Sequence, residues 1–167
     1  YDQAYAMLAL AAAGEPIPIL AGARLTGRAK GLGLGLLSVQ TRSTDREPAN
    51  QFAVARVRRN LFRNSDVGAL FMTRINTDAG GDWNRVFGLD ANLRFFGSLD
   101  WSSYVMKSEA PGSDGRDVSF RTSLNREGNF FHGKGGVLQI GEDFRDDLGY
   151  YRRVGVRKYF MDVGVRP

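Results

Sequence analysis

The 167-residue sequence has 23 basic and 18 acidic side chains, a net charge of +5, and no cysteine. A chain of this length is expected to form one domain, and the lack of cysteine excludes disulfide frameworks, thiolate zinc sites and cysteine nucleophiles. The basic residues are nearly all arginine and are spread along the chain, so without a basic stripe or a stacking module we expect no nucleic-acid partner.

The first 13 residues differ in character from the rest. Residues 4–13 (AYAMLALAAA) resemble a signal-peptide core, but no basic region precedes them, and a short helix is the alternative. We interpret residues 1–13 as an N-terminal segment outside the barrel and residues 14–167 as part of a β-barrel domain. Because the chain starts at Tyr1 and ends at Pro167 within an expected strand, we interpret it as a fragment of a longer protein.

From residue 17 onward apolar and polar residues alternate with period two, which predicts β-strands with one apolar face. The alternation occurs at residues 19–26, 53–58, 67–76, 87–96, 118–125 and 153–157. Tight turns are predicted at residues 28–31, 63–66 and 97–98, and longer polar loops at residues 42–49, 77–82 and 110–116. The sequence therefore predicts about nine antiparallel strands and no long helix after residue 13.

Strand length favours a membrane barrel over a soluble one. Ten residues span about 33 Å, or about 23 Å of height when tilted by ~45°, which is close to the ~25 Å apolar band of an outer-membrane barrel. The apolar side carries many alanines, which fill a soluble core poorly, while the polar side carries mid-strand arginine, aspartate and asparagine. We predict an all-β fold: part of an antiparallel up-and-down transmembrane β-barrel.

The alternation assigns side chains to the two faces of this wall. Residues expected to line the lumen are Arg24, Arg56, Arg58, Arg74, Asp90, Asn92, Arg94, Arg121, Asn125, Arg153 and Arg157. Residues expected to face lipid are Ala53, Ala55, Val57, Ala69, Phe71, Phe87, Leu89, Ala91, Leu93 and Phe95. The charged set forms either a structural ladder of ion pairs or an electropositive conduit for anionic or sugar solutes.

Several stretches resemble a bacterial family of unknown function. They are residues 17–27 (IPILAGARLTG), 52–59 (FAVARVRR), 67–71 (VGALF), 86–96 (VFGLDANLRFF) and 140–144 (IGEDF), the last followed by Leu148-Gly149-Tyr150 and Arg153. Members of that family join a family 9 carbohydrate-binding-like module to a C-terminal outer-membrane-type β-barrel. The resemblance implies a longer barrel and carbohydrate as a partner through an N-terminal module, and it implies no catalytic residues.

Three features of the sequence are candidate chemical sites. His132 is the sole histidine, and no nucleophile motif flanks any serine. Glu142, Asp143, Asp146 and Asp147 form an acidic segment that fits no calcium-loop spacing, so we expect a solvated hairpin turn. Residues 31–35 (GLGLG) are interpreted as a glycine-rich strand rather than a phosphate-binding loop. No catalytic residue, metal or cofactor is assigned.

These inferences predict a barrel segment in a bacterial outer membrane, with membrane lipid as its partner and a role in solute passage or a surface or carbohydrate-related task. Two alternatives remain. A barrel-embedded surface hydrolase requires His132 within hydrogen-bond reach of a serine and a carboxylate. A soluble β-barrel that binds an apolar ligand requires Phe87, Leu89, Leu93 and Phe95 to be buried.

Overall fold

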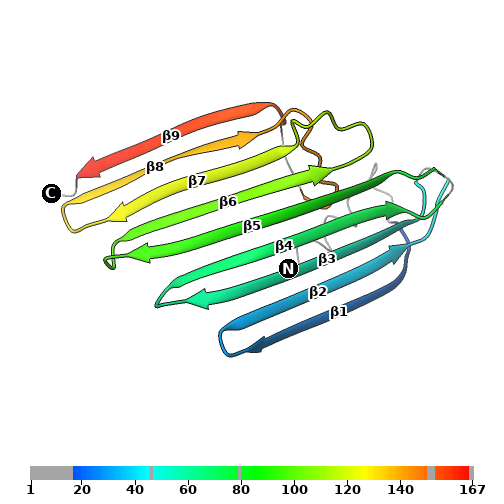
Figure 1. Cartoon of the computed structure of the whole chain (residues 1–167), viewed down its shortest axis with the longest axis horizontal. Coiled ribbons are helices and arrows are strands. Elements are labelled where there is room, and N and C mark those ends of the chain that lie inside the picture. The colour runs from blue at the N-terminus through cyan, green and yellow to red at the C-terminus, as the bar shows by residue number, and fades with distance from the viewer. Residues whose placement is uncertain (1–16, 46, 79, 150–152, 166–167) are drawn as a thin grey trace.

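The computed structural model describes residues 17–45, 47–78, 80–149 and 153–165 (Figure 1), so the expected N-terminal segment of residues 1–13 lies outside the described residues. The strands have 10 to 13 residues each, matching the long runs of alternation. In chain order they are β1 (Ile19–Ala29), β2 (Leu32–Thr41), β3 (Asn50–Leu61), β4 (Ser65–Asn76), β5 (Trp83–Phe95), β6 (Leu99–Glu109), β7 (Val118–Glu127), β8 (Phe131–Ile140) and β9 (Val156–Val165).

The strands form one nine-stranded sheet in sequence order, and every neighbouring pair is antiparallel. This confirms the predicted all-β, antiparallel, up-and-down arrangement. Within the described residues β1 pairs only with β2 and β9 only with β8, so the sheet is open and the barrel closure expected from the sequence is absent from it. Among these residues no helix has the length and apolar character needed to cross a membrane.

Tight turns lie at one end of the sheet and longer connections at the other (Figure 1). The turn between β1 and β2 is made by Lys30 and Gly31, whose φ angles of 49° and 78° suit the two-residue turns that match the right-handed twist of a hairpin. Phe96 and Gly97 take similar angles of 50° and 72° between β5 and β6. The predicted order of tight turns and long loops is therefore observed.

The register separates two faces of opposite character. Val57, Ala69, Leu89 and Val105 lie opposite one another on β3 to β6 and belong to what we call the apolar face. One residue further along each strand, Arg58, Gly68, Asp90 and Tyr104 form a row on what we call the polar face. Side chains alternate between the two faces because the pleat has period two.

The buried core is small and lies on the polar face. Within the described residues only Val39, Val86, Ile140 and Phe144 are buried apolar side chains. The last three pack together against Met72, Met106 and Leu138. Phe144 belongs to the connection between β8 and β9, whose residues 141–149 we call the covering loop because Phe144 packs there against the sheet.

Candidate functional site

The polar face brings together nearly all of the side chains that were expected to line a lumen. By register, nine of the eleven share this face: Arg24, Arg56, Arg58, Arg74, Asp90, Asn92, Arg94, Arg121 and Asn125. Arg153 precedes β9 and lies outside the strands.

The expectation that Arg157 shares this face is wrong. Arg157 pairs in register with Gln139, which pairs with Phe120 and through it with Val105 on the apolar face. The Arg157 guanidinium donates a 2.8 Å hydrogen bond to Gln139. The alternation of Val154 and Val156 with their polar neighbours predicts the wrong phase here, because Val156, opposite Ile140, lies on the polar face.

All ten residues expected to face lipid lie on the apolar face: Ala53, Ala55, Val57, Ala69, Phe71, Phe87, Leu89, Ala91, Leu93 and Phe95. Leu89 is 61% exposed and Phe87 46%, and Phe95 is also exposed. On the opposite side of the same strand Val86 is 0% exposed. Of the four side chains that the soluble alternative requires to be buried, Phe87, Leu89 and Phe95 are exposed in this open sheet and Leu93 is half-buried.

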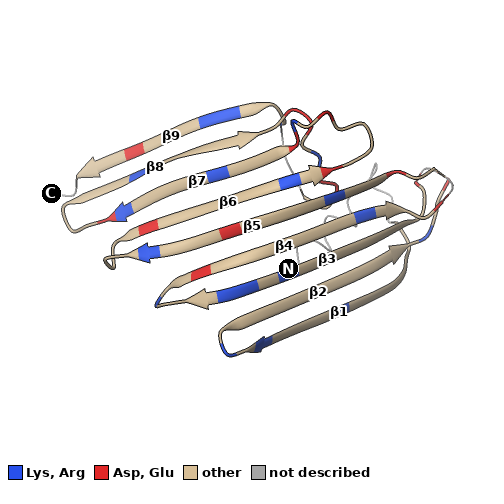
Figure 2. Cartoon of the chain, viewed as in Figure 1, with Lys and Arg blue, Asp and Glu red and all other residues tan. Residues whose placement is uncertain are grey.

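Near the tight turns, basic and acidic residues lie close together on β3 to β7 (Figure 2), and opposite charges pair across the polar face between adjacent strands or, for Arg56 and Asp90, between β3 and β5. Arg56 of β3 binds both carboxylate oxygens of Asp90 on β5. Arg58 lies 2.5 Å from Asp66, which also accepts a 3.2 Å hydrogen bond from Asn92. The forked contact of Arg56 with Asp90 is the strong geometry for guanidinium and carboxylate.

Arg56 reaches Asp90 by crossing over Gly68 of the intervening strand β4. A Cβ atom at Gly68 would lie 2.8 Å from the guanidinium carbon of Arg56, too close for contact. The glycine therefore leaves the room that the Arg56 side chain occupies between β3 and β5.

We expect Gly68→Val to push the Arg56 guanidinium off Asp90 and to lower the free energy of unfolding by about 0.5–1.5 kcal/mol, the net value of a typical hydrogen bond. A double-mutant cycle with Asp90→Asn checks this by denaturant unfolding. The substitution should have a smaller effect in the Asp90→Asn background. Equal effects in both backgrounds would contradict the proposed role of Gly68.

At the long-loop end a second network joins the sheet to the covering loop. Arg74 of β4, whose side chain is 13% exposed, lies 2.5 Å from Asp82 and 2.6 Å from Asp147. Arg145 of the covering loop contacts the same two carboxylates, each at 2.9 Å. Two arginines thus share two aspartates, and one residue of each type comes from the loop.

Backbone hydrogen bonds seat the covering loop as well. Asn84 of β5, which is fully buried, donates a 2.9 Å hydrogen bond to the carbonyl of Arg145 and accepts one of 3.1 Å from the amide of Asp147. Ser108 accepts a 3.0 Å hydrogen bond from the amide of Arg145. Phe144, 3% exposed, fills the apolar patch beside them.

The prediction that this acidic segment is a solvated hairpin turn is wrong. The segment is folded onto the sheet because it supplies both a core phenylalanine and a charged pair that matches Arg74 and Asp82. No cluster of three metal-ligating side chains occurs among the described residues.

The surroundings of the loop shift several ionisation equilibria. Hydrogen bonds from Arg145 and Arg74 lower the pKa of Asp82 to about 2. The contacts with Asp82 and Asp147 raise the pKa of Arg145. Burial raises the pKa of Asp146, although its carboxylate accepts hydrogen bonds from the amides of Leu148 and Gly149.

Acid should release the covering loop through Asp82. Because its pKa is lower in the folded state than the ordinary 3.8, Asp82 stabilises the fold above about pH 4, and this contribution is lost as the pH falls toward about 2. We expect the protection of residues 141–149 against hydrogen exchange, measured relative to the intrinsic exchange rate at each pH, to fall over that range. In Asp82→Asn this fall should shrink, and an unchanged pH profile of protection in this variant would contradict the assignment.

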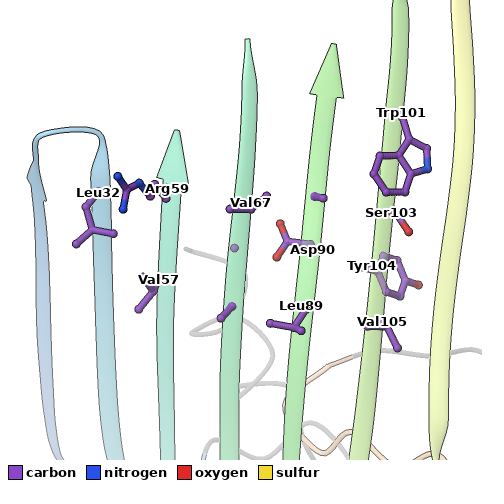
Figure 3. Close-up of a pocket in the computed structure, with 13 residues that line it drawn as sticks. Leu32, Val57, Arg59, Val67, Leu89, Asp90, Trp101, Ser103, Tyr104 and Val105 are labelled. Carbon is purple, nitrogen blue, oxygen red and sulfur yellow. The ribbon is translucent and has the colours of Figure 1, made fainter. Parts of the chain in front are cut away.

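The apolar face carries a shallow groove of about 570 Å³ across β2 to β6, shown in Figure 3. Val67, Ala69 and Ala91 contribute small side chains to its lining, and Leu89 and Trp101 lie along it. Arg59 marks the end near the tight turns. The aromatic residues Trp83, Phe95 and Tyr159 also lie on this face by register.

His132 has no serine partner among the described residues. Its Nε2 atom lies 3.8 Å from Asp162, and its Nδ1 atom is buried without a hydrogen-bond partner. The arrangement that a surface hydrolase requires is therefore not assembled around His132. The segment GLGLG follows the predicted strand: Gly31 lies in the turn, and Gly33 and Gly35 lie in β2.

Sequence reasoning missed the partners of the expected arginines, which are Asp66, Asp82, Asp100 and Asp147. It also missed three further members of the covering-loop network, Asn84, Ser108 and Arg145. Asn84 could have been found, because it is an even-numbered residue of β5, like Asp90 and Asn92. The covering-loop partners could not, since their contacts with the sheet join residues 37 to 73 positions apart.

Comparison with known proteins found no matching family model, no similar curated protein and no similar solved structure.

Proposed function

We propose that the nine strands form part of the wall of a β-barrel in a bacterial outer membrane, through which a small polar solute passes. The apolar face then contacts lipid and the polar face lines the passage. The observation that carries this proposal is the contrast along β5, where Leu89 is 61% exposed while Val86 on the other side is 0% exposed. A water-soluble sheet would bury the apolar side instead.

The unpaired edges of β1 and β9 in the described sheet need further strands if the sheet lies in a membrane. In hydrocarbon every backbone donor and acceptor needs a partner, so only a closed barrel is stable there. We therefore propose that strands beyond the described nine pair with the free edges of β1 and β9. The nine described strands, with lengths of 10 to 13 residues, are long enough for a tilted membrane strand, which needs about 9–11 residues.

The apolar groove supports lipid as the neighbour of this face. Its lining is mainly apolar, and Arg59 and Trp101 lie toward one end (Figure 3). A tryptophan and a cation at the end of an apolar band are typical of the membrane–water interface.

The paired charges support a water-filled passage on the other side. Arg56, Arg58 and Arg74 each have a carboxylate partner on the polar face, which an aqueous lumen tolerates. The covering loop folds over the same face, where we propose that it narrows the passage. A carbohydrate-related role stays a prediction from the resemblance alone.

Reconstitution of the protein together with the proposed closing strands into phospholipid vesicles and planar bilayers tests this function. We expect this protein to float with the vesicles, to resist extraction at alkaline pH, and to open discrete conductance steps in the bilayer. Membrane insertion without conductance would contradict solute passage, and failure to insert would contradict the whole proposal.

A further inference from the structure

A hollow of about 850 Å³ lies on the polar face between β1, β2 and β3. Five cationic side chains line it: Arg24, Arg28, Lys30, Arg56 and Arg58. The remaining lining residues are uncharged. This hollow is separate from the covering loop, none of whose residues contributes to it.

Two glycines keep the hollow open. Gly33 of β2 lies in register between Arg28 of β1 and Arg58 of β3. Gly35 lies in the same way between Thr26 and Arg56. Because neither glycine has a side chain, the space between the arginines of the outer two strands stays unfilled. The GLGLG segment thus gives the hollow its floor.

The charges of the hollow are only partly balanced. Arg56 and Arg58 bind Asp90 and Asp66, whose carboxylates lie outside the lining. Within the described part of the chain, Arg28 and Lys30 have no ion pair. A concave surface with unbalanced positive charge favours an anion, and guanidinium groups recognise oxyanions through forked hydrogen bonds.

We propose that this hollow binds the oxyanion group, a phosphate, sulfate or carboxylate, of a small polar solute. The proposal rests on the proposed function for the route by which the solute arrives, and it names the solute class of that passage. Arg28 and Lys30 supply the free charge, while Arg56 and Arg58 are held in place by their aspartates.

Calorimetric titration of the full chain in detergent micelles with inorganic phosphate tests the site, at about 0.15 M ionic strength to suppress unspecific attraction. We expect saturable binding that Arg28→Gln weakens about tenfold, as loss of one charge-assisted hydrogen bond predicts. Arg59→Gln is the matched control, because Arg59 lies next to Arg58 on β3 but belongs to the opposite face. This variant should bind phosphate as the wild type does.

A second variant fills the hollow without changing its charge. A Cβ atom at Gly33 would make only ordinary contacts, of 3.7 Å to the carbonyl of Arg58 and 3.9 Å to Arg28, so Gly33→Leu should fold. We expect it to lose phosphate binding. Parallel titrations with sulfate and acetate then rank the three oxyanions.

Absence of saturable phosphate binding at millimolar concentrations would overturn the proposal, as would equal weakening by Arg28→Gln and Arg59→Gln. These results are distinguishable from failure of the proposed function. A chain that inserts and conducts but does not bind phosphate refutes the anion site alone, whereas a chain that binds phosphate but does not enter membranes refutes only the passage.

Discussion

Leu89→Arg should destabilise the membrane-embedded protein by about 2–4 kcal/mol, the cost of an arginine on the lipid face near the bilayer midplane. Leu89 lies midway along β5 and is exposed on the apolar face. The expected loss arises because the guanidinium would lie in hydrocarbon, where neither water nor a carboxylate solvates it. Denaturant unfolding of the protein in phospholipid vesicles measures the effect.

Asn92→Arg is the matched control, since it adds the same side chain to the same strand on the polar face. Asn92 neighbours Asp66, to which it already donates a hydrogen bond, so the new charge has a partner there. We expect a loss of stability clearly smaller than that of Leu89→Arg, because the new guanidinium lies beside a carboxylate and water rather than in hydrocarbon. Equal and small effects of both substitutions would contradict contact between Leu89 and lipid.

Arg74→Gln should release the covering loop and lower the free energy of unfolding by about 1.5–3 kcal/mol, the range for hydrogen bonds to charged groups. Arg74 is the sheet residue that contacts both Asp82 and Asp147, and it also donates a 3.0 Å hydrogen bond to Asn50. Without it, the carboxylate of Asp147 loses its partner on the sheet. Trypsin should then cleave after Arg145 faster, because a released loop reaches a protease more readily.

Arg116→Gln serves as the control for this loop. Arg116 also contacts the covering loop, at 2.5 Å from Glu142, but both side chains are about 60% exposed or more. Exposed ion pairs contribute about 0–1 kcal/mol, so tryptic cleavage should stay at the wild-type rate. If trypsin cleaved the Arg74→Gln variant at the wild-type rate as well, the proposed role of Arg74 in holding the loop would be contradicted.

The sequence predicted the strands and their faces well because side-chain alternation is a local signal. Phe87 and Leu89 alternate with Gly88 and Asp90 over enough residues to fix the phase of β5. At β9 the alternation covers few residues, and the face of Arg157 was therefore assigned wrongly.

Local side-chain alternation could not predict the network of contacts around the covering loop. Asn84 and Arg145 meet across 61 positions of the chain, and no periodicity links them. Its four acidic residues predict a solvated segment, whereas the burial of Phe144 and the pairing of Asp147 with Arg74 hold it against the sheet. The burial of Phe144 and the ion pair of Asp147 both depend on the positions of β4, β5 and β8 in the sheet.

A spin-label scan along β5 tests the central claim most directly, since the sequence has no native cysteine to interfere. Single cysteine substitutions from Phe87 to Arg94 are labelled in vesicles, and each label's accessibility to oxygen and to a water-soluble nickel complex is measured. We predict that labels at Phe87, Leu89, Ala91 and Leu93 contact oxygen in lipid, while those at the alternate positions contact the nickel complex. Uniform access of the nickel complex, or the opposite phase, would contradict the account.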